Sequence, residues 1–193
     1  MNYDVIIVGG GPAGLFSAYY LSEHSAKSVL LIDKGKVSQK RNCPIKSYHE
    51  CIKCKPCNIL SGIGGAGLFS DGKLKYIYKL GKTDLSQFMP LHQAEKLIDE
   101  TEEIFNKFGM DGPAYPTDME EAREIRKRAK RYGIDLLIIK QKHLGSDRLP
   151  EHIACMADYI KSKGVAIHTS EEVKEVLIEN NHVVGVATNC KNY

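Results

Sequence analysis

Three glycines at a fixed spacing are the first feature of this chain that could do chemistry. Gly9, Gly11 and Gly14 form the pattern G-x-G-x-x-G directly after an apolar run. The first glycine permits a tight turn, the second lets the main chain approach a pyrophosphate, and the third lets helix and strand pack closely. Asp33 lies nineteen residues after Gly14, where a carboxylate can accept hydrogen bonds from ribose hydroxyls. The pattern predicts a dinucleotide site that disfavours the 2′-phosphate of NADP; a glycine turn without ligand would not require the acid.

A group of cysteines is the second such feature. A C-x2-C-x2-C run is typical of an iron–sulfur cluster, and four thiolates also suit tetrahedral zinc. A redox dithiol, or small buried residues without chemistry, are the other interpretations. The basic neighbours Lys53 and Lys55 would favour thiolates under each of these interpretations. The sequence leaves these alternatives open for the four cysteines of the candidate metal site: Cys43, Cys51, Cys54 and Cys57.

The elements that position the glycines follow from the hydrophobic pattern. Residues 3–8 and 28–33 are continuous apolar runs, typical of strands buried in a parallel sheet. Between them Pro12 opens a segment with helical spacing of apolar residues. Strand, glycine turn, helix and strand make a βαβ unit with a right-handed crossover.

The rest of the chain predicts an insertion followed by a return to the sheet. Residues 34–78 lack clear periodicity, which is typical of a functional insertion. A buried stripe that includes Leu91 and Leu97 predicts the first of the later helices, and Thr117 with Glu120 forms a capping box for the second. The later elements are expected as follows: helices over 85–108, 117–132 and 150–163, strands over 135–139 and 165–168, and a hairpin of 173–178 and 183–188.

The predicted fold is therefore α/β: a Rossmann-like parallel sheet with an inserted mixed segment and a C-terminal β-hairpin. Residues 1–36 and 146–193 are expected to form the dinucleotide-binding domain, and residues 37–145 the insertion. A net charge of +3 is too weak to argue for a nucleic-acid partner or a membrane surface, and no nucleic acid is expected as partner. The basic residues between 123 and 131 are expected on a solvated helix face. No stretch is long enough to span a bilayer and no secretory signal opens the chain, so the cytoplasm is the expected compartment.

Longer segments resemble a known family. The opening DVIIVGGGPAGLFSAYYL resembles the FAD-dependent oxidoreductases that include glutathione-reductase-like and geranylgeranyl-reductase-like enzymes. The segments RNCPIK, CIKCKPCNILSGIGGAGLFSDGKL and KHLGSDRLPEHI resemble a bacterial and archaeal family of NAD(FAD)-utilizing dehydrogenases, essentially from end to end. The resemblance implies FAD as cofactor and hydride transfer through its flavin, with a small-molecule substrate or an electron carrier such as NAD(P)H as partner.

The resemblance also implies which residues hold FAD. The pyrophosphate is expected at the first turn, the ribose at Asp33, and the adenine at the main chain of Val173. Lys34, next to Asp33, is also expected in the cofactor site. A cysteine pair could exchange electrons with the flavin. The remaining cofactor residues belong to two glycine loops, the first for the pyrophosphate and the second for the flavin ring: Gly9, Gly10, Gly11, Pro12, Ala13 and Gly14, then Gly65, Ala66 and Gly67.

Four further polar residues have two interpretations each. Lys73 could stabilise reduced flavin or belong to a surface turn. His143 and Arg148 could contact substrate or phosphate or be ordinary loop residues, and Asp147 could cap a helix. No catalytic acid or base is identified.

Members of the resembled families are longer and return to the sheet with a further strand. The chain is therefore expected to be an N-terminal fragment, with an incomplete sheet whose first strand keeps one edge open. The competing interpretations of the function are a non-catalytic nucleotide- or metal-binding module and an NAD-dependent dehydrogenase.

Overall fold

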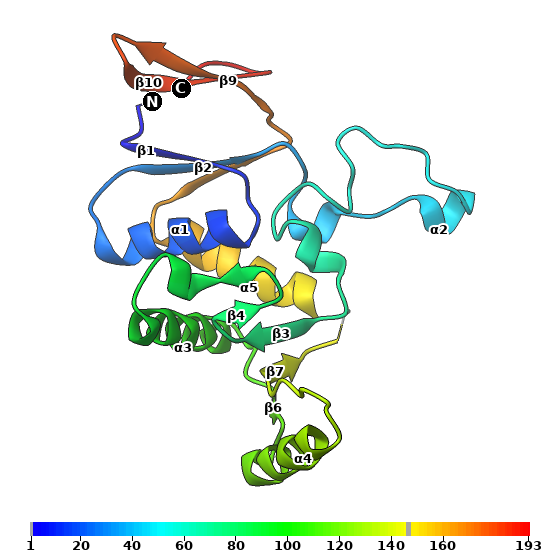
Figure 1. The fold of residues 1–193 in the computed structure, drawn as a ribbon. Helices are drawn as coiled ribbons and strands as arrows, with labels where there is room; N and C mark the ends of the chain where they lie inside the picture. Colours follow the sequence, from blue (N-terminus) through cyan, green and yellow to red (C-terminus); the bar gives the residue numbers. More distant parts are fainter. Residues whose placement is uncertain (1, 146–147) are drawn as a thin grey trace. The chain divides into compact units, whose positions relative to one another are not determined.

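The computed structural model describes residues 2–145 and 148–193 (Figure 1). The chain forms two compact units: unit 1 comprises Met1–Ser70 and Ser146–Tyr193, and unit 2 comprises Asp71–Gly145. Residues 37–70 fall in unit 1, where Lys36 bridges Gly62 and the Arg41 side chain binds the same loop. The domain division expected from the sequence stays a prediction.

Unit 1 is built on a parallel sheet of the order β1 (Val5–Val8), β2 (Val29–Asp33) and β8 (Ala166–Thr169). Every residue of β2 is buried, which explains its unbroken apolar sequence. Helices α1 (Pro12–His24) and α5 (Leu149–Ser162) lie on one side of this sheet (Figure 1). The predicted α/β fold with its interrupted parallel sheet is confirmed.

The other face of the sheet is covered by a β-hairpin of β9 (Val173–Glu179) and β10 (His182–Thr188). Leu30 and Ile32 of β2 pack against Val186 of the hairpin in one buried cluster. Asn180 and Asn181 both have positive φ at the turn, as a tight hairpin turn requires. Strand β1 pairs with β2 alone in the described part of the chain, so the expected open edge is present.

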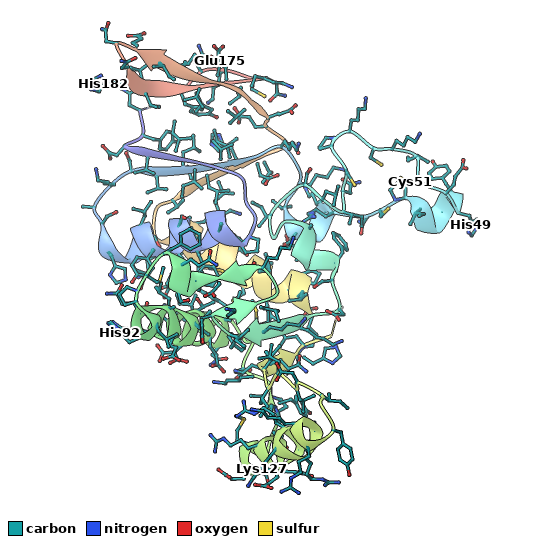
Figure 2. All side chains as sticks on the ribbon, viewed as in Figure 1. His49, Cys51, His92, Lys127, Glu175 and His182 are labelled. Atoms are coloured by element: carbon teal, nitrogen blue, oxygen red, sulfur yellow. The ribbon has the colours of Figure 1, made fainter. Side chains whose placement is uncertain are left out.

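Unit 1 also holds the loop between β2 and the boundary at Ser70. It contains three short helical segments: η1 (Ser38–Lys40), α2 (Ile45–Tyr48) and η2 (Ala66–Phe69). The cysteine run lies between α2 and η2, and Cys51 is exposed close to α2 (Figure 2).

Unit 2 is a small mixed domain. Its main sheet has the antiparallel order β3 (Lys73–Tyr76), β7 (Lys140–His143), β6 (Ala114–Tyr115). The pair β4 (Lys79–Leu80) and β5 (Thr83–Asp84) precedes η3 (Leu85–Gln87) and two helices, α3 (Leu91–Lys107) and α4 (Met119–Arg131). None of the described helices combines the length and apolarity needed to cross a bilayer.

Three expected features of unit 2 are wrong in detail. The strand expected over 135–139 begins at Lys140, because pairing with β3 fixes the register and exposes Leu137 instead. The helix expected from residue 85 begins at Leu91, because Pro90 occupies the N-cap and restricts the residue before it. The cap of α4 is Asp118, whose carboxylate accepts from the Glu121 amide, in place of Thr117 with Glu120.

The apolar stripe expected on α3 is also partly wrong, because a charged residue of this helix is buried. Leu91 and Leu97 are exposed, whereas Glu102 is buried. The Glu102 carboxylate pairs with Lys140 and, at 3.1 Å, with the buried Lys142. Polar pairing with β7 therefore fixes the position of this helix in place of a continuous apolar stripe.

The ion cluster around Glu102 leads to a pH prediction. Burial raises the pKa of Glu102, but the hydrogen bonds from Lys140 and Lys142 lower it by more, so the pKa lies below its ordinary value of 4.5. The ionised Glu102 therefore stabilises the folded state fully above pH 4.5, and this contribution is lost as the pH falls through the lowered pKa. Glu102→Gln should cost about 3 kcal/mol at pH 7, because buried Lys142 loses its counter-charge. Urea unfolding of unit 2 should show this cost shrinking below pH 4.5; an equal cost at pH 7 and in acid would contradict it.

Candidate dinucleotide-binding site

The glycine turn joins β1 to α1, and each of its three fingerprint glycines has a separate physical reason. Gly9 has φ +106°, which other residues adopt only with strain. A Cβ on Gly14 would lie 1.9 Å from the Gly9 carbonyl oxygen, so this position must be bare for helix and strand to pack. A Cβ on Gly11 would approach only the Cα of Gly65, at 3.9 Å. Packing therefore does not require glycine at position 11. A ligand group that approaches the main chain at this position would require it.

The start of α1 is open to an acceptor. Gly11 is the N-cap and, lacking a side chain, makes no capping hydrogen bond, and Pro12 follows at the first helical position. The first amides of a helix have no partner inside it and carry partial positive charge. A turn of this kind can bind a phosphate group with main-chain amides alone.

Asp33 at the end of β2 holds this turn in place. Its Oδ2 accepts the Gly10 amide at 2.7 Å, and its Oδ1 accepts the Gly35 amide at 2.7 Å. The sequence did not predict this clasp, which ties the end of β2 to the glycine turn. A carboxylate has about four lone-pair sites, so two main-chain bonds leave acceptor capacity for ribose hydroxyls. The role of Asp33 toward a ribose stays a prediction.

Replacing the Asp33 carboxylate tests the clasp. Asp33→Asn retains only one acceptor oxygen and places an NH2 group against an amide, so we expect a loss of about 2 kcal/mol in the free energy of unfolding. Asp99→Asn removes an exposed carboxylate and serves as the control, with a change below about 0.5 kcal/mol. Equal stability of the two variants in urea would show that the clasp contributes nothing.

A cleft opens beside the turn at the carboxyl ends of β1 and β2. This edge of a parallel sheet is where α/β proteins commonly bind ligands. The cleft measures about 280 Å³ and brings together four sequence-predicted residues, Gly9, Asp33, Lys34 and Val173. We call it the adenosine cleft. Its remaining lining residues are Val8, Ile32, Leu60, Ser61, Glu171 and Glu172.

The second glycine loop packs directly on the first. The Gly64 amide donates to the Gly10 carbonyl oxygen at 2.8 Å. A Cβ on Gly65 would lie 3.1 Å from the Gly11 Cα and 3.3 Å from the Pro12 Cδ. The structure thus places the start of the predicted flavin loop against the predicted pyrophosphate turn. Gly67 has open space where a Cβ would be.

Arg41 is a central residue of this region that the sequence analysis did not single out. Its side chain is almost completely buried, with an exposed fraction of 2%. The guanidinium donates to the carbonyl oxygens of Asn58 at 3.0 Å, Ile59 at 2.6 Å and Ile63 at 2.8 Å, and lies over the Phe69 ring. Burial lowers the pKa of Arg41, while Asp33 and Cys57 oppose that change. Arg41 therefore holds the main chain that leads into the second glycine loop.

The four cysteines of the predicted metal site are not brought together. Cys54 and Cys57 line a common cleft, Cys51 is exposed, and Cys43 is partly buried elsewhere. Across residues 2–145 and 148–193, no three histidine, cysteine or acidic side chains converge in a way that could hold a metal ion. The iron–sulfur and zinc interpretations remain predictions without support from this geometry.

The other polar candidates make contacts within their own units. In unit 2, Lys73 pairs with Asp71 at 3.0 Å, and His143 Nε2 lies 3.0 Å from the Asp71 carbonyl oxygen. In unit 1, Arg148 is the exposed N-cap residue of α5. Asp147 lies outside the described residues. The roles suggested for these side chains toward flavin or substrate remain predictions.

Comparison with known proteins agrees with the turn geometry. Residues 4–42, which span β1, α1, β2 and η1, match the sequence model of the family described as FAD dependent oxidoreductase. The opening segment is thus similar to the corresponding segment of FAD dependent oxidoreductases. The resemblance seen in the sequence to FAD-dependent oxidoreductases is confirmed for this segment.

Two curated relatives extend the similarity. The chain is 38% identical over 90 residues to the digeranylgeranylglycerophospholipid reductase of Methanococcus vannielii, covering 43% of this chain and 22% of that protein. It is 27% identical over 109 residues to ferredoxin–NADP reductase 2 of Exiguobacterium sibiricum, covering 56% and 27%. The chain thus matches only part of each relative.

Solved structures share the fold. Glycine oxidase from Bacillus cereus aligns with a TM-score of 0.54 at 18% identity, covering 99% of this chain and 52% of that one. An L-amino acid deaminase from Proteus vulgaris, with its specific insertion deleted, aligns at 0.53 and 19%, covering 99% and 50%. The chain therefore spans about half the length of these proteins.

Proposed function

We propose that unit 1 binds FAD and that the chain is part of an FAD-dependent oxidoreductase. The observation that carries the proposal is the bare main chain at Gly11. Packing does not require glycine at position 11, yet this residue is the N-cap of α1 and makes no side-chain capping bond. It lies in the turn that follows β1. The family match over residues 4–42 supports the same cofactor.

The residues of unit 1 fit FAD part by part. The pyrophosphate would be held by main-chain amides of the segment from Gly9 to Gly14. The ribose would meet Asp33 and Lys34, and the adenine would lie near the main chain of Val173 in the adenosine cleft. Acidic residues in that cleft favour the hydroxyl and amino donors of adenosine over a further phosphate. The loop of Gly65, Ala66 and Gly67 would approach the flavin ring.

Bound FAD would supply two-electron chemistry that amino-acid side chains lack. The protein's part is to hold the cofactor and orient it. Asp33 fixes the Gly10 amide, and Arg41 fixes the carbonyl groups before Gly64. The reaction partner would be a small-molecule substrate or an electron carrier, and the name of the relative ferredoxin–NADP reductase 2 supports a carrier such as NAD(P)H.

Identification of the bound cofactor tests the proposal. The protein should be yellow, and denaturation should release FAD in a ratio approaching one per chain, with neither FMN nor a nicotinamide in its place. Apoprotein that takes up NAD in preference to FAD under the same conditions would overturn the assignment. Apoprotein that binds neither dinucleotide would support the non-catalytic interpretation.

A further inference from the structure

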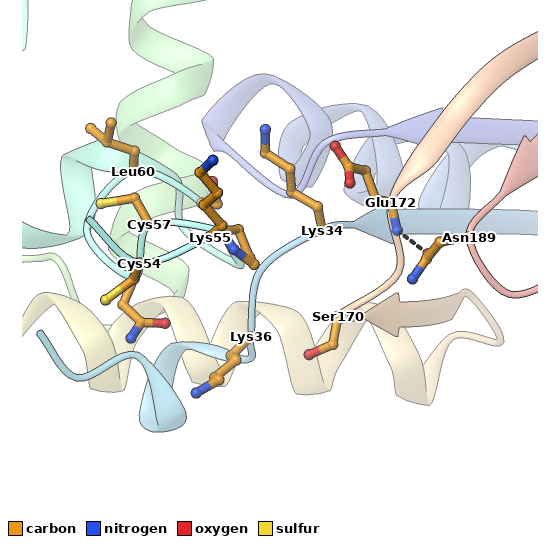
Figure 3. Close-up of a pocket in the computed structure, with 12 residues that line it drawn as sticks. Lys34, Lys36, Cys54, Lys55, Cys57, Leu60, Ser170, Glu172 and Asn189 are labelled. Atoms are coloured by element: carbon orange, nitrogen blue, oxygen red, sulfur yellow. Dashed lines mark hydrogen bonds between the residues drawn. The ribbon is translucent and has the colours of Figure 1, made fainter. Parts of the chain in front are cut away.

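A second cleft adjoins the adenosine cleft, and its chemistry differs. It measures about 960 Å³ and shares four lining residues with the adenosine cleft: Lys34, Leu60, Ser61 and Glu172. Figure 3 shows its lining, which comes from the end of β2, the cysteine loop and the segment after β8. We call it the cysteine cleft.

Two thiols line this cleft together. Cys54 and Cys57 belong to the run Cys-Lys-Pro-Cys, and both are partly exposed in its wall (Figure 3). A C-x-x-C spacing is used by disulfide oxidoreductases, because the two sulfurs can be bridged with little movement of the chain. The exposed Cys51 is not part of the lining.

The cleft is basic. Lys34, Lys36 and Lys55 line it, and none of the three has an ion-pair partner in the part of the chain that the structure describes. Its acid, Glu172, pairs with Lys174 at 2.5 Å, and this contact together with the weaker effect of the Lys34 charge lowers the pKa of Glu172. One acid thus faces three lysines in the lining. Positive charge in the wall of a cleft attracts an anionic partner. The cysteine cleft therefore combines a pair of thiols with a preference for negative charge.

We propose that Cys54 and Cys57 form a dithiol that exchanges with an anionic disulfide bound in the cysteine cleft. One thiolate attacks a sulfur of the disulfide, a mixed disulfide forms, and the first small thiol leaves and takes a proton from solvent. The second cysteine then loses its proton and attacks the cysteine sulfur of the mixed disulfide, which releases the second small thiol. Two electrons pass from the protein dithiol to the small disulfide, which is reduced to two thiols.

Reaction with two disulfides of opposite character tests both parts of the proposal. The reduced protein is treated with oxidised glutathione, which is anionic, and with bis(2-hydroxyethyl) disulfide, which is neutral. We expect peptide mapping to locate a new Cys54–Cys57 disulfide and the anionic reagent to react faster. Lys36→Gln with Lys55→Gln should slow the anionic reaction by about tenfold and leave the neutral one almost unchanged. Lys27→Gln, which removes an exposed lysine that does not line the cleft, should alter neither rate.

Cysteine variants separate exchange from general thiol reactivity. Cys54→Ser and Cys57→Ser should each stop at a stable mixed disulfide with glutathione, because the resolving thiol is gone. Cys155→Ser and Cys190→Ser replace exposed cysteines that do not line the cleft and should behave like the parent protein. Equal reactivity of all exposed thiols would overturn the proposal.

Metal analysis of protein purified without air provides the other decisive outcome. Zinc or iron bound in stoichiometric amount, with Cys54 and Cys57 protected until a chelator is added, would also overturn the proposal. FAD content is measured in the same samples. Failure of exchange in protein that carries FAD would overturn the exchange proposal and leave the proposed function intact. Exchange in protein that binds no FAD would support the exchange proposal and overturn the proposed function.

Discussion

Gly14→Ala should unfold unit 1 or cost about 4 kcal/mol or more in its free energy of unfolding. The added methyl group would lie 1.9 Å from the Gly9 carbonyl oxygen and 3.1 Å from the Gly9 carbonyl carbon. These are main-chain atoms between a buried sheet and its helix, so no side chain can rotate away to make room. Circular dichroism during urea denaturation measures the loss.

Gly67→Ala is the matched control for this substitution. Position 67 has open space where the added methyl group would lie, and its φ does not require glycine. The change should alter the free energy of unfolding by no more than about 1 kcal/mol. Similar stability of the two variants would show that α1 does not pack on β1 in the described way.

Arg41→Met should cost about 4 kcal/mol and release the second glycine loop from its fixed conformation. The substitution keeps an apolar stem but leaves the carbonyl oxygens of Asn58, Ile59 and Ile63 without their donors. Because this loop contacts Gly10 and Gly11, flavin content should fall as well. Hydrogen exchange at the Ile63 and Gly64 amides reports the loop directly.

Two variants serve as controls for Arg41. Arg41→Lys keeps the positive charge but replaces a planar fork of donors with a single ammonium, so we expect roughly half of the loss. Arg128→Met removes an exposed arginine of α4 and should change stability by less than about 0.5 kcal/mol. If Arg41→Lys matched the parent protein, charge would matter and the fork geometry would not.

The βαβ unit was predictable because its signals are local. Glycine spacing, Pro12 and two unbroken apolar strands each report a requirement of the same short segment. The third strand and the hairpin followed from equally local patterns, such as Asn180 and Asn181 at the turn. Of the cofactor residues predicted from sequence, Gly9, Asp33, Lys34 and Val173 line one cleft.

The features that the sequence did not reveal depend on contacts between distant segments. The carbonyl groups bound by Arg41 lie 17 to 22 residues further along the chain, and no periodicity marks them. Glu102 is buried because lysines of β7 neutralise it, a pairing that hydropathy alone cannot indicate. The start of β7 at Lys140 is likewise fixed by its ladder with β3. The run RNCP, which contains Arg41, belongs to a segment that carries the family resemblance. The sequence therefore marked this segment, but only the structure shows that Arg41 binds the carbonyl groups of the loop.

A titration of apoprotein with FAD, comparing the parent chain with Gly11→Ala, tests the FAD assignment most directly. A methyl group at position 11 meets only the Gly65 Cα at 3.9 Å, so the thermal stability of the apoprotein should be unchanged. The same methyl group would fill the space into which the pyrophosphate must come, and FAD affinity should fall by about a hundredfold, equivalent to about 2.7 kcal/mol. Equal FAD affinity of the two proteins, or no FAD binding by the parent, would contradict the assignment.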